Sequence, residues 1–201
     1  YKIGEFKTLL GWSLNASFIS SMLLENDHHF DAYILLSPNW ENFNQSIFDH
    51  IEKGIDKKFV CVSTSEYDLQ GHRKSIAELQ LEYFSKQIFK NVEYQYDDFK
   101  GEHHTSLVNR SMPYAVKHIF SLYKPVNQID LQAFMKSSDK MKFLEEVYKS
   151  SNSFYGTKRT FTDLDFEEFA DLAIEEKNWQ ALKEISKINI KIFPKLQTGY
   201  F

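Results

Sequence analysis

The feature that most constrains the fold is an alternation of short apolar runs with helical patterns between Phe6 and about Tyr123. The expected strands cover residues 6–10, 30–36, 58–63 and 92–96, and the expected helices cover residues 16–24, 44–53, 75–89 and 111–123. Strands separated by helices lie parallel in one sheet and are joined by crossovers. The runs around Tyr33 and Val60 are almost continuously apolar, as in strands covered on both faces. The sequence therefore predicts an α/β fold with a mostly parallel sheet.

After Lys124 and Pro125 only helical patterns remain, at residues 131–149, 166–177 and 179–193. Asp165 is placed to cap the second helix. The last two helices resemble a tetratricopeptide-like hairpin, and a single hairpin cannot build a solenoid. We therefore predict two domains, an α/β domain over residues 1–125 and a small all-helical extension over residues 126–201.

Composition excludes some classes of partner. The chain has 201 residues, a net charge of −4 and 42% hydrophobic residues, so no overall positive field attracts nucleic acid. No apolar stretch approaches the ~20 residues that span a membrane. The single cysteine, Cys61, cannot form a disulfide within the chain and is expected to be a buried strand residue. Cysteine usage this low does not assign a compartment, and localisation stays open.

The segment from Phe6 to Leu24 has the layout of a nucleophile elbow, in which a strand, a sharp turn with a serine and a helix follow one another. The turn contains Gly11 and Ser13, and Asn15 stands where the motif has its last glycine. Asn tolerates tight turns and left-handed conformations better than most residues. Ser13 is therefore the candidate nucleophile, and the alternative is a serine that caps the following helix.

A histidine pair and two acids complete a possible triad. His103 and His104 follow the last expected strand, where this fold requires a general base, while Glu66 and Asp68 follow the strand at residues 58–63. The order nucleophile, acid, histidine is that of α/β-hydrolases. The alternatives for the histidine pair are a solvated loop or a zinc site, although no companion Cys or His cluster stands at ligand spacing.

These motifs resemble those of the esterase family of α/β-hydrolases that includes esterase D and the enterochelin (siderophore) esterases. The resemblance covers about residues 6–123. It rests on Gly11-Trp12-Ser13-Leu14 for the family's Gly-His-Ser-Leu-Gly-Gly elbow, on residues 30–33 leading to Ser37-Pro38, on residues 62–66 for the acid loop, and on residues 102–106 for a Glu-x-His-x-Ser pattern.

The resemblance implies a role for each matched residue. It selects His104 as the base, places Ser106 beside it as a supporting hydroxyl, and makes Glu66 the acid, with Asp68 as the alternative. The backbone N–H of Leu14 would supply one oxyanion donor. Trp12 stands at a variable position of the elbow, and Trp40 matches an aromatic residue near the pocket of family members.

The implied function is a serine hydrolase of small-molecule carboxylic esters that needs no metal or organic cofactor. The chain begins just before the elbow, so we expect earlier strands, and the loop with the second oxyanion donor, to belong to a longer bacterial protein. The segment alone is then expected to be poorly active, with a sheet edge that needs those strands or a complementing chain. An acyltransferase on the same fold and a non-catalytic interaction module are the alternatives.

Overall fold

The computed structural model describes residues 5–24, 29–41, 57–82, 91–123 and 126–195. The chain divides into two compact units, an α/β unit over Phe6–Ser121 and a helical unit formed by Tyr1–Glu5 together with Leu122–Phe201. The division after Ser121 lies four residues before the boundary expected after residue 125. Each unit has its own hydrophobic core.

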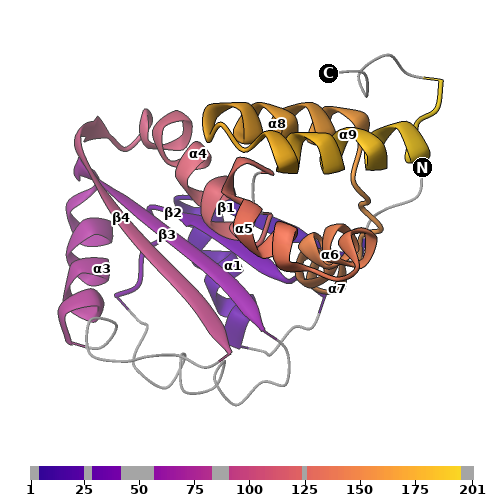
Figure 1. The fold of residues 1–201 in the computed structure, drawn as a ribbon. Coiled ribbons are helices and arrows are strands. Elements are labelled where there is room, and N and C mark those ends of the chain that lie inside the picture. Colours follow the sequence, from indigo (N-terminus) through magenta and orange to yellow (C-terminus); the bar gives the residue numbers. More distant parts are fainter. Residues whose placement is uncertain (1–4, 25–28, 42–56, 83–90, 124–125, 196–201) are drawn as a thin grey trace. The chain divides into compact units, whose positions relative to one another are not determined.

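The α/β unit is built on a parallel sheet, which has four strands in the described part of the chain (Figure 1). Its order is β1 (Thr8–Trp12), β2 (Ala32–Leu36), β3 (Lys58–Tyr67) and β4 (Val92–His103). Every neighbouring pair is parallel. This confirms the α/β fold with a parallel sheet that the alternating pattern predicts.

Helices cover both faces of this sheet. Side chains alternate along a strand, so Val60 and Val62 of β3 point to one face and Phe59 and Cys61 to the other. Val60 and Val62 belong to a core with buried residues of α1 (Leu14–Leu24) and α3 (Gln70–Glu82). The helix α4 (Leu107–Ile119) packs on the opposite face. There the rings of His118 and Phe59 meet edge to face, with their centroids 5.5 Å apart.

The strands β3 and β4 are longer than the apolar runs that predicted them. β3 continues to Tyr67 instead of residue 63, and β4 to His103 instead of residue 96, with Ser65 paired to Phe99 and an irregularity before Tyr67. Their polar ends stay extended because each strand supplies the other's hydrogen bonds, which a local hydropathy pattern does not contain. The helices α1, α3 and α4 also start earlier than expected. The expected helix at residues 44–53 lies outside the described residues.

In the helical unit the helix expected over residues 131–149 is three helices, α5 (Leu131–Lys136), α6 (Lys140–Val147) and α7 (Lys149–Tyr155), preceded by a 3₁₀ turn at Val126–Gln128. The Asp139 side chain accepts a hydrogen bond from the Lys142 N–H at 3.0 Å, which starts a new helix after the break. An aspartate satisfies free amides at a helix start better than in a helix interior.

The last two helices, α8 (Asp163–Glu175) and α9 (Trp179–Ile192), agree closely with expectation. The expected cap is wrong, because Thr162 caps α8 and Asp165 is the third residue of a capping box with it. The core of this unit is rich in phenylalanine and small residues, including Phe134, Phe166, Phe169, Ala170, Ala173, Ala181 and Ile185. Among the described helices, none combines the length and the apolar character that crossing a bilayer requires.

Candidate active site

The polar residues of the site come from corresponding positions in the sheet. Ser13 follows β1, Ser37 follows β2, Asp68 follows β3, and His104 follows β4. The carboxyl ends of parallel strands share one edge of a sheet, which is where open α/β sheets bind ligands. The sequence predicted three of these four positions as site residues and treated Ser37 only as the end of a strand.

The turn at Ser13 has the strained geometry of a nucleophile elbow. Ser13 has a φ of 58°, which is left-handed backbone that side-chain-bearing residues adopt at a cost. A Cβ on Gly11 would lie 2.6 Å from Ile19 Cδ1 and 2.8 Å from the Ala16 backbone, so only glycine lets α1 approach β1 this closely. Asn15 lies exposed in the first turn of α1 without a positive φ. Its replacement of a glycine therefore leaves the turn intact.

His104 is paired with Asp68. Its Nδ1 lies 2.6 Å from Asp68 Oδ1, the Asp68 side chain is fully buried, and 17% of the His104 side chain is exposed. A carboxylate only accepts hydrogen bonds, so Nδ1 carries the proton and Nε2 is left with its lone pair. This is the tautomer that a general base needs.

Glu66, the acid that the resemblance puts first, makes a different contact. Its carboxylate accepts a hydrogen bond from the Gly101 N–H at 2.9 Å. The physical reason is the extra length of β3, which makes Glu66 a strand residue and leaves Asp68 as the acid beyond the strand end. The structure thus brings together His104 and the alternative acid, Asp68.

Three further residues of the predicted set surround His104 or its loop. Trp12 Nε1 donates to the His104 carbonyl at 3.1 Å, and the two rings lie 5.1 Å apart, so Trp12 packs directly on the candidate base. His103 turns away and stacks on Tyr67 at 5.0 Å. The Ser106 hydroxyl donates to Glu102 Oε2 at 2.6 Å. Within the described part of the chain it makes no hydrogen bond with the His104 ring, so it supports the loop instead of the imidazole.

Trp40 and Leu14 differ in their surroundings. Trp40 is 2% exposed and donates from Nε1 to Ser20 Oγ at 2.9 Å, which makes it part of the core beneath α1. One side of Trp40 lines a cavity of about 260 Å³ beside α3, and no predicted triad residue lines that cavity. Leu14 is the first residue of α1, so its N–H is one of the amides without an intrahelical acceptor.

Ser37 and His72 are the site residues that the sequence interpretation missed. Ser37 Oγ donates to Asp68 Oδ1 at 2.8 Å and lies 3.1 Å from His104 Nδ1. His72 Nδ1 lies 2.8 Å from the Ser37 carbonyl oxygen and 3.2 Å from Ser37 Oγ. A carbonyl only accepts, so His72 also carries its proton on Nδ1. The only available signal was the position of Ser37 at the end of an apolar strand, and nothing local marks His72.

The same residues form a set of three potential metal ligands. The ligand atoms of Asp68, His72 and His104 lie within 4.8 Å of one another, so the histidine loop does have companions that sequence spacing did not reveal. Ser37 Oγ lies among all three, however, and both Nδ1 atoms direct their protons at oxygen acceptors. An ion held by the two Nδ1 atoms would have to displace both protons and the hydroxyl, so the arrangement around Ser37 is that of a hydrogen-bond network.

The Ser13 hydroxyl makes no hydrogen bond with His104 or with the first amides of α1 in the described residues. Instead the Ser13 backbone is anchored, since its N–H donates to the Leu36 carbonyl at 2.8 Å and its carbonyl accepts from Ser17 N–H at 3.1 Å. The hydroxyl therefore does not act as a helix cap, which was the alternative for Ser13. Nucleophile and base are often loosely aligned when no substrate is bound.

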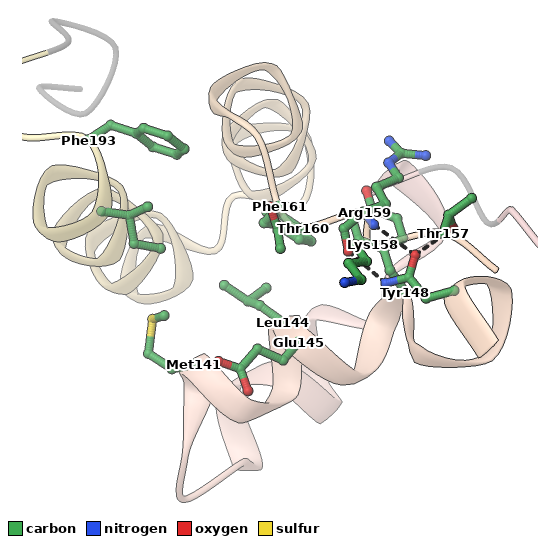
Figure 2. A pocket seen from close by; sticks show the side chains of 12 residues that line it. Met141, Leu144, Glu145, Tyr148, Thr157, Lys158, Arg159, Thr160, Phe161 and Phe193 are labelled. Atoms are coloured by element: carbon green, nitrogen blue, oxygen red, sulfur yellow. Dashed lines mark hydrogen bonds between the residues drawn. The ribbon is translucent and has the colours of Figure 1, made fainter. Parts of the chain in front are cut away.

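A larger cavity, of about 610 Å³, belongs to the helical unit. Figure 2 shows Met141, Leu144, Phe161 and Phe193 around this space. Its polar lining includes Lys158 and Arg159, and Arg159 is held by Asp165 at 3.0 Å. None of the predicted catalytic residues lines this cavity, so its size does not make it the place of the predicted chemistry.

No family model and no curated protein matches the chain. Solved structures do match the chain. An uncharacterised protein from Capnocytophaga ochracea superposes with a TM-score of 0.66 at 19% identity, over 95% of this chain and 54% of that one. An IroE-like serine hydrolase from Shewanella oneidensis has a TM-score of 0.63 at 14% identity, over 94% of this chain and 60% of that one.

These likenesses concern the fold. At such identities they show that the chain shares the architecture of the two proteins, the second of which is described as a serine hydrolase. The chain spans little more than half the length of each. The expected parallel sheet with flanking helices and a helical C-terminal part is thereby confirmed as an architecture that these solved structures share.

Proposed function

We propose that this chain carries the triad of a serine hydrolase that acts on carboxylic esters, with Ser13 as nucleophile, His104 as base and Asp68 as acid. The observation that carries the proposal is the 2.6 Å hydrogen bond between His104 and the fully buried Asp68 carboxylate. It sets the tautomer of a histidine that packs against Trp12, the residue immediately before the strained Ser13. The shared fold with an IroE-like serine hydrolase supports the same class of chemistry.

In the proposed reaction Ser13 Oγ bonds to the ester carbonyl carbon while His104 Nε2 takes its proton. The tetrahedral intermediate collapses, the C–O bond to the alcohol breaks, and His104 returns the proton to the leaving alcohol. Water then attacks the acyl-enzyme with the same base, releasing the carboxylic acid and free Ser13. In this proposal the Leu14 N–H, in the first turn of α1, donates to the oxyanion. Asp68 stays ionised and stabilises the imidazolium.

The test is labelling of the full-length protein with a fluorophosphonate probe, together with hydrolysis of short acyl esters. Ser13→Ala should abolish labelling and lower kcat by at least ~10³-fold. Ser153→Ala, a change at an exposed serine of α7, is the matched control and should leave both unchanged. Labelling that persists in Ser13→Ala would contradict the proposal.

The lack of a Ser13–His104 hydrogen bond favours the second candidate, a non-catalytic interaction module. The labelling experiment distinguishes the hydrolase from the non-catalytic module, because an inert elbow gives no labelling even in the unmodified protein. If labelling occurs, analysing the products formed with an added alcohol separates ester hydrolysis from acyl transfer, since only a transferase gives the new ester in preference to the acid.

A further inference from the structure

Ser37 combines three features that seldom occur together. It has a left-handed φ of 50°, it is fully buried, and its hydroxyl lies between the carboxylate and the imidazole of the proposed triad. Residues other than glycine keep such a conformation only where their surroundings fix it, and strain of this kind gathers at functional sites. Serine has no intrinsic preference for this conformation. The presence of a serine at this position is therefore best explained by what its hydroxyl group does.

Both backbone polar groups of Ser37 are held by hydrogen bonds. Its N–H donates to the Ser63 carbonyl at 2.8 Å, which ties it to β3. Its carbonyl accepts from His72 Nδ1 at 2.8 Å, which ties it to α3. These two bonds direct the side chain toward Asp68, whose Oδ1 accepts the Ser37 hydroxyl proton at 2.8 Å.

The Asp68 carboxylate is oriented by several donors. Oδ1 accepts from His104 Nδ1, from Ser37 Oγ and from the Leu69 N–H at 2.8 Å, while Oδ2 accepts from the Ser65 N–H at 3.3 Å. Leu69 and Ser65 are backbone donors next to Asp68 in the sequence. Besides His104, Ser37 is the side-chain donor that comes from another strand end, and it links the carboxylate to the end of β2.

We propose that Ser37 is a positioning residue of the triad, which fixes the Asp68 carboxylate against His104, and that His72 holds Ser37 in its left-handed conformation. The kinetic part of this inference rests on the proposed hydrolase function. The hydrogen-bond network itself does not, so it can be tested in a protein that lacks activity.

Ser37→Gly is the informative variant, because glycine accepts a φ of 50° without strain and lacks the hydroxyl. We expect a melting temperature that is unchanged or higher, a kcat lowered about tenfold and a KM within about twofold. Lys177→Gly, at an exposed residue with a φ of 53° in the helical unit, is the matched control and should raise stability without changing kcat. A Ser37→Gly protein with unchanged kcat would overturn the proposal.

His72 offers a second variant pair. Asn places an amide N–H near the position of Nδ1, so His72→Asn should keep most of the activity, whereas His72→Leu should lose about as much as Ser37→Gly. Equal activity of the two His72 variants would overturn the role of His72, since it would show that the hydrogen bond to the Ser37 carbonyl is dispensable.

The Nδ1 proton of His104 lies in a 2.6 Å hydrogen bond, so we expect its proton resonance at low field, which gives a readout that is independent of catalysis. In proton NMR spectra of the Ser13→Ala protein, adding Ser37→Gly should shift or broaden this resonance, and adding Lys177→Gly should not. An unchanged resonance would overturn the inference even if Ser13 is the nucleophile. A changed resonance in a protein whose Ser13 proves inert would refute only the proposed function.

Discussion

At the scale of single residues, one hydrogen bond decides which acid serves His104. Asp68 Oδ1 accepts from His104 Nδ1, and Glu66 accepts from the Gly101 backbone. Asp68→Asn would put an amide in place of the carboxylate and favour the wrong imidazole tautomer. We expect it to lower kcat/KM by ~10²–10⁴-fold, whereas Glu66→Gln, which keeps an acceptor oxygen, should stay within about threefold.

The pair is measured as kcat/KM on one ester, with thermal melting to show that both variants are folded. A greater loss in Glu66→Gln than in Asp68→Asn would reinstate Glu66 as the acid. The sequence could not settle this choice, because both acids follow the same apolar run and the register of β3 beyond that run depends on β4. Ser13 and His104 were easier to select, since each lies at a turn that the local pattern marks.

At the scale of elements, the buried thiol of β3 should make stability depend on pH. Burial, together with a smaller effect of the nearby Asp97 carboxylate, raises the pKa of Cys61 to about 12. In the unfolded chain the thiol loses its proton near pH 8.5, so above that pH the unfolded state binds fewer protons than the native state. The free energy of unfolding should therefore fall as pH rises from about 8.5 to about 12, by up to about 1.4 kcal/mol per pH unit from this group.

The measurement is urea unfolding of the unmodified protein and of Cys61→Ala across this pH range. Cys61→Ala also lowers stability at neutral pH because it removes buried volume, so the slopes are compared and not the absolute values. Other groups, among them Tyr94, whose pKa burial also raises, titrate in both proteins and cancel. Parallel curves would show that the thiol does not contribute.

A second prediction at this scale concerns the start of α8. Asp165 is buried and accepts from Tyr148 Oη, Arg159, and both the N–H and the hydroxyl of Thr162. Asp165→Ala would remove one half of a capping box and leave these donors unpaired. We expect it to lower the free energy of unfolding of the helical unit by roughly 3 kcal/mol.

The check is chemical unfolding followed by circular dichroism, with Asp171→Ala on the exposed side of α8 as the control. A loss below ~1 kcal/mol in Asp165→Ala would mean that water satisfies the donors as well as the carboxylate does. Sequence reasoning recognised Asp165 as a terminus residue but assigned it the cap, because Thr162 and Asp165 both suit that position and only the backbone geometry separates them.

The helices and strands fall into two groups, those that the local sequence pattern predicts and those that it does not. Apolar strands flanked by helices follow from the local pattern, and β1, β2 and the helices α8 and α9 lie within about two or three residues of expectation. The long polar ends of β3 and β4, and the division of residues 131–155 into α5, α6 and α7, depend on partners or caps that a hydrophobic period does not report. The site depends on those same polar ends, which is why its acid and its supporting residues were the least predictable parts.

At the scale of the whole molecule, β1 lies at one edge of the sheet in the described residues. Exposed apolar side chains lie on and just beyond it, with Leu10 42%, Leu14 79% and Phe18 67% exposed. Leu14 and Phe18 are four residues apart on α1 and therefore share a face. This surface agrees with the expectation that further strands or a complementing chain cover the edge, which stays a prediction.

The two hydrophobic cores share no residue, so we expect each unit to respond to its own core substitutions. Phe166 is fully buried and packs edge-on against Phe161 at 5.0 Å. Phe166→Ala should cost ~3–5 kcal/mol and raise amide exchange throughout α5–α9. Protection of β1–β4 should not change. Val62→Ala, in the other core, should raise exchange in the sheet and leave the helical unit unchanged.

Hydrogen exchange followed by mass spectrometry reports both units in one experiment. Fluorophosphonate labelling of Ser13 in the same samples shows whether the proposed site depends on the helical unit. Exchange that rises across both units in Phe166→Ala would show that they unfold as one cooperative body. Exchange confined to the helical unit, with labelling of Ser13 intact, would show that the strand ends holding Ser13, Ser37, Asp68 and His104 are maintained by the sheet and its own helices.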